Sequence, residues 1–254
     1  MRAIGIDIGS SCAKTAVTDG QGNILWLDQM PTGWSSVEAA EEIRKRLAAA
    51  GFDPGHGPCV ATGYGRVVVP FAQKAVTEIS CHAKGAQKLF GLADLDIIDI
   101  GGQDTKVISV RGGSVRDFLM NDKCSAGTGR FLEVMANTLR TDSASLIAMA
   151  AEGSDTSISS MCTVFAESEV ISLIGKGESR ENIAFAVVTS IAKKIASQAS
   201  RLCADGVQTV LTGGLCEAEQ LRKALSLELG RDIISCENAR YAGAIGAALF
   251  AEKL

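Results

Sequence analysis

The feature that most constrains this chain is a faint internal duplication. The run Ile6-Asp7-Ile8-Gly9 returns as Ile98-Asp99-Ile100-Gly101, and at the same offset Lys106 repeats Lys14 and Gly112 repeats Gly20. Each copy has the pattern of a strand, a tight glycine turn, a second strand and a hairpin turn. Because helical segments follow each copy, the order predicts two similar α/β domains that face each other across a cleft.

The predicted boundary lies near residue 97. The first domain is expected to cover residues 1–97 and the second 98–239, with a C-terminal helix, 240–254, that can pack back on the first. Capping residues and apolar periodicity predict the other main elements. These are helices at 35–50, 130–140 and 181–204, and a buried strand at 207–211.

Composition and charge narrow the class of function. The net charge is −4 and no basic run is present, which argues against nucleic acid or an anionic membrane surface as the main partner. The longest apolar stretches are too short to span a bilayer, and the first residues have the pattern of a buried strand. We therefore expect a cytoplasmic protein. The 27 glycines gather in short clusters, a pattern that brings backbone close to a ligand.

The first copy of the repeat has the features of a phosphate-binding loop. A hydrophobic strand delivers Asp7 to its end, and a turn of small residues follows, whose backbone N–H groups can hold phosphate oxygens. A carboxylate beside phosphate needs a cation between them, so Asp7 is predicted to hold Mg²⁺ through water. The expected nucleotide-binding residues are Gly9, Ser10, Ser11, Cys12, Ala13 and Lys14.

The second copy repeats this logic, with Asp99 as the predicted Mg²⁺ residue and Gly101, Gly102, Gln103 and Lys106 near phosphate. A third glycine site, Gly213 and Gly214, ends a buried strand and allows close approach of a nucleoside. Any one of these loops alone could be only a tight turn. The chain has neither a Walker A sequence nor a dinucleotide-binding glycine motif after its first strand.

Together the three loops resemble those of the sugar kinase, heat-shock chaperone and actin superfamily. The resemblance implies a duplicated, two-domain actin-like or sugar-kinase-like α/β fold that binds ATP or ADP between its domains. On this reading Asp104 or Gln103 orients the attacking water, although Asp104 could equally be a surface turn residue.

Two of the eight cysteines stand apart. Cys124 and Cys162 each precede an apparent helix start, where partial positive charge favours a thiolate. Neither has the close second ligand of a structural zinc site. A [4Fe–4S] cluster needs four thiolates, and a two-fold dimer would supply two from each copy. The alternative is a pair of buried thiols, which is also the interpretation given to the scattered Cys12, Cys59, Cys81, Cys203, Cys216 and Cys236.

The runs NDKCSAGTGRFLEVMA, CTVFAESEVISL, ATGYGR and IDIGGQDTKV resemble the activators of (R)-2-hydroxyacyl-CoA dehydratases and the ATPase subunits of benzoyl-CoA reductase. The resemblance runs nearly end to end. It implies a homodimer with one [4Fe–4S] cluster held by Cys124 and Cys162 of both chains. It further implies an electron received from ferredoxin or flavodoxin and passed, with ATP hydrolysis, to a dehydratase or related reductase.

Two other functions compete with this expectation. One is a small-molecule kinase of the same fold, which would give the cysteine pair no role. The other is an ATP-switched binding module without a cluster. Iron content and ATP turnover discriminate among the three.

Overall fold

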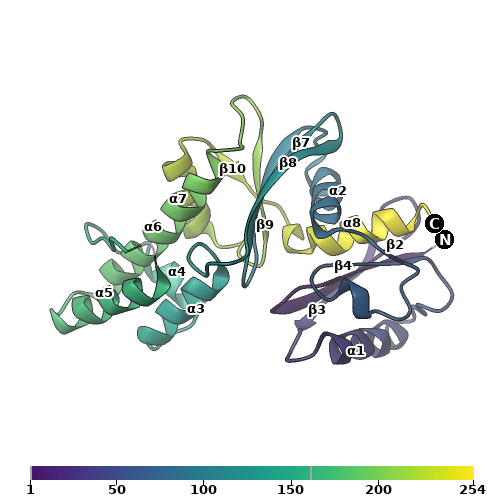
Figure 1. The fold of residues 1–254 in the computed structure, drawn as a ribbon, viewed down its shortest axis with the longest axis horizontal. Coiled ribbons are helices and arrows are strands. Elements are labelled where there is room, and N and C mark those ends of the chain that lie inside the picture. The colour runs from purple at the N-terminus through teal and green to yellow at the C-terminus, as the bar shows by residue number, and fades with distance from the viewer. Residues whose placement is uncertain (1, 161) are drawn as a thin grey trace. The chain divides into compact units, whose positions relative to one another are not determined.

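The computed structural model describes residues 2–160 and 162–254. The chain forms two compact units (Figure 1). The first comprises Met1–Leu95, Val110–Arg116 and Cys236–Leu254, and the second comprises Asp96–Ser109 and Asp117–Ser235. Each unit is organised around one five-stranded sheet.

The sheet of the first unit has the strand order β3-β2-β1-β4-β5. Its strands are β1 (Ala3–Ile8), β2 (Cys12–Thr18), β3 (Ile24–Pro31), β4 (Cys59–Thr62) and β5 (Lys74–Ala75). The hairpin strands β1, β2 and β3 are antiparallel, whereas β4 runs parallel to β1. Its helices are α1 (Ser36–Ala49), α2 (Glu78–Phe90) and α8 (Ala242–Ala251), with short 3₁₀ turns η1 (Arg66–Val68) and η2 (Ala239–Tyr241).

Helices cover both faces of this sheet. Ala40, Ile43 and Leu47 of α1 join the apolar residues of β1, β2 and β4 in one buried cluster. On the other face, α8 packs against β1, β2 and β4, and α2 lies beside it (Figure 1). Small residues make this second layer very close: a methyl group at Gly5, Gly85 or Gly246 would overlap a neighbouring backbone carbonyl.

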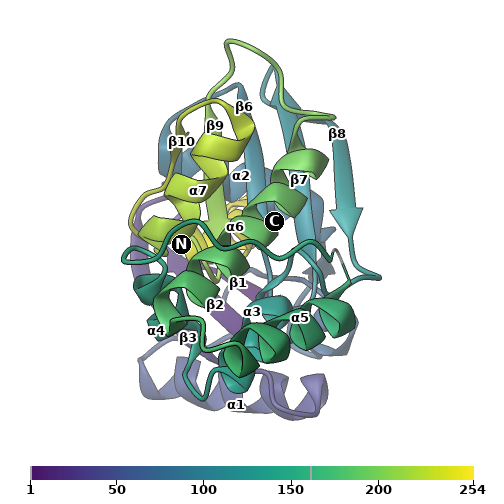
Figure 2. The same cartoon turned by 90° about the vertical axis from the view of Figure 1, so that its left-hand side faces the viewer.

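The second sheet has the strand order β10-β9-β6-β7-β8, and residues 110–116, where β7 ends and β8 begins, belong to the first unit together with Leu95. Its strands are β6 (Leu95–Ile100), β7 (Thr105–Arg111), β8 (Ser114–Asn121), β9 (Thr209–Gly213) and β10 (Ile233–Ile234). Its helices are α3 (Gly129–Thr138), α4 (Ser143–Met149), α5 (Thr163–Gly175), α6 (Arg180–Ala199) and α7 (Glu219–Leu229). Helices α6 and α7 pack side by side, and α3 contacts α4, α5 and α6 (Figure 2).

Two predicted elements have different bounds from those expected: the helix is shorter, and the strand is shifted by two residues. The helix predicted at 181–204 ends at Ala199, because the backbone at Ala204 is held in a turn by Asp96 (2.9 Å to Oδ2) and by Arg231 (2.8 Å to the carbonyl). The strand predicted from residue 207 begins at Thr209, which pairs in register with Asp96. The cap predicted for the first helix is confirmed, since Ser35 accepts from the amide of Glu38.

Candidate functional site

The first predicted phosphate loop is a closed turn between β1 and β2. The Gly9 amide donates to the carbonyl of Cys12 at 3.1 Å, which fixes the turn. Ser10 and Ser11 are exposed at its tip, Cys12 and Lys14 are half-buried, and Ala13 is buried. The structure thus presents the tip of this loop to solvent, where a ligand can reach it.

Asp7 lies beneath this loop in a crowded environment. Its side chain is nearly buried, and its Oδ2 lies 3.8 Å from Nε2 of His82, which in turn lies 3.8 Å from Oε1 of Glu78. A methyl group at Gly63 or Gly243 would overlap the carboxylate. His82 could not be predicted as a neighbour of Asp7, because α2 brings it there from a distant part of the chain.

The second loop repeats the turn of the first. The Gly101 amide donates to the carbonyl of Asp104 at 2.9 Å, the same spacing that joins Gly9 to Cys12. Asp99 is buried, Gln103 is exposed, and the side chain of Asp104 is 24% exposed. The duplication therefore extends from sequence to hydrogen bonding, and Gln103 and Asp104 are the accessible side chains of this turn.

Lys106 and Thr212 hold the carboxylates of this second loop. Lys106 is only 1% exposed, and its Nζ lies 2.5 Å from Oδ2 of Asp104 and 3.5 Å from Oδ2 of Asp99. The hydroxyl of Thr212 donates to Oδ1 of Asp99 at 2.7 Å. Thr212 and Asp99 face each other in the parallel pair β6–β9. The second predicted phosphate loop is thereby bonded to the strand that carries the predicted nucleoside site.

The glycines of that nucleoside site have distinct roles. Gly213 has φ of +88°, and a methyl group there would overlap the carbonyl oxygen of Ile100. The amide of Gly214 donates to the same oxygen at 3.1 Å. A side chain at Gly214 would meet no atom within 4 Å. The close backbone approach requires Gly213, and Gly214 leaves open space above the loop.

Cys124 and Cys162 are exposed, whereas Cys59, Cys81 and Cys216 are buried and Cys12, Cys203 and Cys236 are half-buried. Cys162 occupies the N-cap position of α5. Cys124 lies further from its helix, because residues 125–128 form a turn before α3 begins. The residues that follow the two exposed cysteines are bonded to each other, since the Ser125 and Thr163 hydroxyls are 2.8 Å apart. This bond holds the two cysteine segments together within the second unit.

The Cys124 segment is also bonded to the second phosphate loop. The hydroxyl of Thr105 donates to the carbonyl of Gly127 at 2.5 Å. The amides of Gly129 and Arg130, at the start of α3, donate to the carbonyls of Gly101 (3.0 Å) and Gly102 (2.7 Å). Three hydrogen bonds therefore connect the two loops directly.

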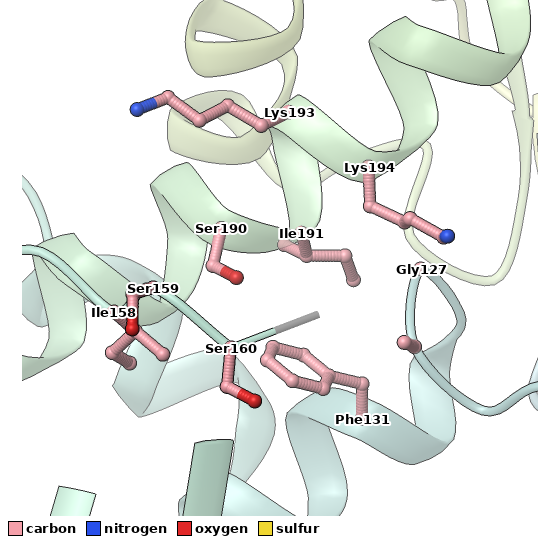
Figure 3. A pocket seen from close by; sticks show the side chains of 10 residues that line it. Gly127, Phe131, Ile158, Ser159, Ser160, Ser190, Ile191, Lys193 and Lys194 are labelled. Atoms are coloured by element: carbon pink, nitrogen blue, oxygen red, sulfur yellow. The ribbon is translucent and has the colours of Figure 1, made fainter. Parts of the chain in front are cut away.

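A pocket of about 310 Å³ lies in the second unit, and Figure 3 shows the side chains that line it. Phe131 and Gly127 line one side, Ser159 and Ser160 another, and α6 closes it with Ser190, Ile191, Lys193 and Lys194. Glu169 of α5 anchors this wall by accepting from the amide (2.8 Å) and the hydroxyl (2.9 Å) of Ser159. Ser159 is thus fixed to α5, and it lines the pocket together with Ile158 and Ser160.

Burial suppresses the ionisation of two of the cysteines. Burial raises the pKa of Cys59 and of Cys81 to about 12, so both stay protonated at neutral pH.

Within residues 2–160 and 162–254, no three side chains of His, Cys, Asp or Glu gather so that they could hold a metal ion. Every helix in the described part of the chain falls short of the length and apolar character needed to cross a bilayer.

Two duplicated β-turn-β loops, each following a buried aspartate, together with a late Thr-Gly-Gly strand end, define a nucleotide-binding protein of the actin-like and sugar-kinase-like class. A ROK family glucokinase from Streptomyces griseus, solved with glucose and AMPPNP, shares this fold with a TM-score of 0.60 at 16% identity, over 100% of both chains. The predicted fold class is confirmed.

The chain belongs to the BadF/BadG/BcrA/BcrD ATPase family, whose model matches residues 4–251. It is 41% identical to the activator of lactoyl-CoA dehydratase from Anaerotignum propionicum, over 99% of this chain and 97% of the relative. The predicted family and the predicted ATPase are confirmed.

Two solved structures are similar over the whole chain. Component A of the (R)-2-hydroxyglutaryl-CoA dehydratase from Acidaminococcus fermentans has a TM-score of 0.93 at 39% identity, covering 100% of this chain and 98% of that one. The activator of the 2-hydroxyisocaproyl-CoA dehydratase from Clostridium difficile, with bound ADPNP, has a TM-score of 0.91 at 36% identity, covering 100% and 95%.

Proposed function

We propose that this chain is an ATP-dependent electron donor that activates a 2-hydroxyacyl-CoA dehydratase or a related reductase component. Two copies hold one [4Fe–4S] cluster through Cys124 and Cys162 of each. The proposed donor is a ferredoxin or flavodoxin, which loses one electron; the acceptor enzyme gains one, and ATP and water become ADP and phosphate. We place this reaction in the cytoplasm. The names of the relatives, activators of acyl-CoA dehydratases, support the class of partner.

The observation that carries the proposal is the 2.8 Å contact between the Ser125 and Thr163 hydroxyls. It keeps two exposed thiols on neighbouring segments, where both are available to one cluster. The N-cap position of Cys162 adds the partial positive charge of the α5 N-terminus, which suits an anionic cluster.

The thiolates of Cys124 and Cys162 fit a cluster shared by two chains better than a cluster held by one chain. One chain supplies two thiolates where a cluster takes four, and a symmetric dimer supplies the remainder. Val164 and Phe165, beside Cys162, are both 66% exposed. A second copy placed on the cysteine segments would remove such apolar surface from water. When bound there, the cluster would supply a one-electron carrier.

The nucleotide site is proposed from both loops. Asp7 and Asp99 serve Mg²⁺ through water, the turn backbones of residues 9–14 and 101–103 bind phosphate, and Gly213 and Gly214 receive the nucleoside. The exposed Gln103 and the partly exposed Asp104 are the candidates for orienting the attacking water. We also propose that the boundary between the two domains lies near residue 97.

Anaerobic purification tests the cluster. We expect about four irons per dimer, visible absorbance, and loss of both in Cys124→Ser and in Cys162→Ser. Cys236→Ser, at a half-buried thiol outside the two segments, is the matched control and should keep its iron. Iron-free, monomeric wild-type protein that still hydrolyses ATP would refute the electron-transfer part of the proposal.

The nucleotide site is tested separately. Asp7→Asn and Asp99→Asn should lose ATP hydrolysis while keeping iron and dimer. The cysteine variants should show the opposite pattern, with Mg-ADP binding retained. If the aspartate variants hydrolyse ATP at the wild-type rate, the proposed Mg²⁺ residues are wrong.

A further inference from the structure

Lys106, in β7 directly after the second predicted phosphate loop, is a buried cation. Lysine is almost never fully buried unless it is paired, because removing an ammonium from water is costly. Here the residue is 1% exposed, and its Nζ lies within 3.5 Å of carboxylate oxygens of both Asp99 and Asp104. The positive charge of Lys106 is therefore compensated by carboxylates inside the protein.

We propose that Lys106 is a positioning residue that acts as the internal counter-ion of Asp99 and Asp104, instead of contacting phosphate itself. This inference rests on the proposed function, in which that loop binds Mg-nucleotide. Both carboxylates approach one nitrogen, so they lie close to each other. Without the ammonium, two like charges would sit at a loop that receives an anionic polyphosphate.

The surrounding bonds fix the geometry of this arrangement. Thr212 donates to Oδ1 of Asp99 at 2.7 Å, so Lys106 and Thr212 hold the two oxygens of one carboxylate from opposite strands, β7 and β9. Asp104 is the partly exposed partner, at 24%, and its Oδ1 packs over the Cα of Gly101. Lys106 thereby holds Oδ2 of the Asp104 carboxylate, while Oδ1 lies against Gly101.

The counter-ion role makes a prediction that a phosphate contact does not. Lys106→Met should weaken binding of mant-labelled ADP by about tenfold or more, because the local charge becomes more negative by one unit. The double variant Lys106→Met/Asp104→Asn restores that charge and should return to within about threefold of wild type. Lys106→Arg keeps the charge and should bind within a few-fold of wild type. Lys223→Met, at an exposed lysine of α7, is the matched control and should bind normally.

The experiment uses the anaerobic dimer, with ADP binding measured by fluorescence at several Mg²⁺ concentrations and thermal unfolding measured alongside. If Lys106→Met and the double variant bind equally weakly, Lys106 contacts phosphate and the proposal is overturned. Wild-type binding by Lys106→Met, with only its unfolding temperature lowered, also overturns it. If Lys106→Met does not fold, the double variant must still fold and bind for the proposal to stand. A wild-type protein that binds no nucleotide would refute the proposed function instead.

Discussion

The packing of α8 against α2 yields a quantitative prediction for Gly246→Ala. A methyl group at Gly246 would overlap the carbonyl oxygen of Cys81 and lie 2.6 Å from its carbonyl carbon. Ordinary carbon contacts are about 3.5–4.0 Å, so the two helices must separate by about 1 Å. Overpacking of this kind costs about 1–3 kcal/mol, and the upper end applies because the obstacle is backbone. A gain of about 1 kcal/mol in helix propensity offsets part of this.

The net loss is about 2 kcal/mol, which for a chain of this size lowers Tm by about 4–8 °C. Circular dichroism during thermal unfolding of the anaerobic protein measures it. Gly175→Ala is the matched control, since Gly175 ends α5 in open space and the change should leave stability equal or slightly higher. A Gly246→Ala variant that unfolds at the wild-type temperature would refute the close-packing argument.

Three further predictions concern the buried thiols, the first predicted loop and the cysteine segments. Cys59 and Cys81, with pKa values of about 12, should resist alkylation by iodoacetamide at pH 8, because only about one thiol in 10⁴ is ionised there. The ionised fraction should rise about tenfold per pH unit. Mass spectrometry that finds these two thiols labelled as fast as the exposed thiols would contradict this. Gly243→Ala places a methyl group against the Asp7 carboxylate and should raise the Mg²⁺ concentration needed for half-maximal ATP hydrolysis by about tenfold; an unchanged Mg²⁺ titration would count against the role of Asp7. Thr163→Val removes the 2.8 Å link between the cysteine segments and should speed the loss of visible absorbance in air without changing ADP affinity; equal decay rates would show that the link does not hold the segments.

The sequence alone was sufficient for the features that are local and repeated. The duplicated Asp-x-Gly runs predicted two turns, and the structure closes both with the same amide-to-carbonyl bond. The helix at Ser35 followed from its cap, which depends on neighbours three residues apart. The exposure of Cys124 and Cys162 agrees with the distinction drawn from their surroundings.

Other features of the candidate site depend on tertiary packing and could not be predicted. His82 approaches Asp7 only because α2 packs beside α8, which covers β1, and no local sequence pattern predicts that packing. The burial of Lys106 was also hidden, because β7 is buried on both faces and shows no alternation that would mark a lysine as inward-facing. The glycines at 85 and 246 have no turn to explain them; only the close approach of two helices does.

The hydrogen bonds around Gly127 connect the Cys124 segment to the second predicted phosphate loop. Coupling requires that the nucleotide bind one arrangement of the protein more tightly than another. In the second unit, the Gly101 and Gly102 carbonyls accept from the first amides of α3, and Thr105 holds Gly127. If this loop shifts on binding phosphate as proposed, the shift must move the Cys124 turn or break these bonds. The Ser125–Thr163 contact would pass the same displacement to Cys162. Because interiors are close-packed and cannot stretch continuously, both thiols should respond together, as control of a shared cluster by ATP would require.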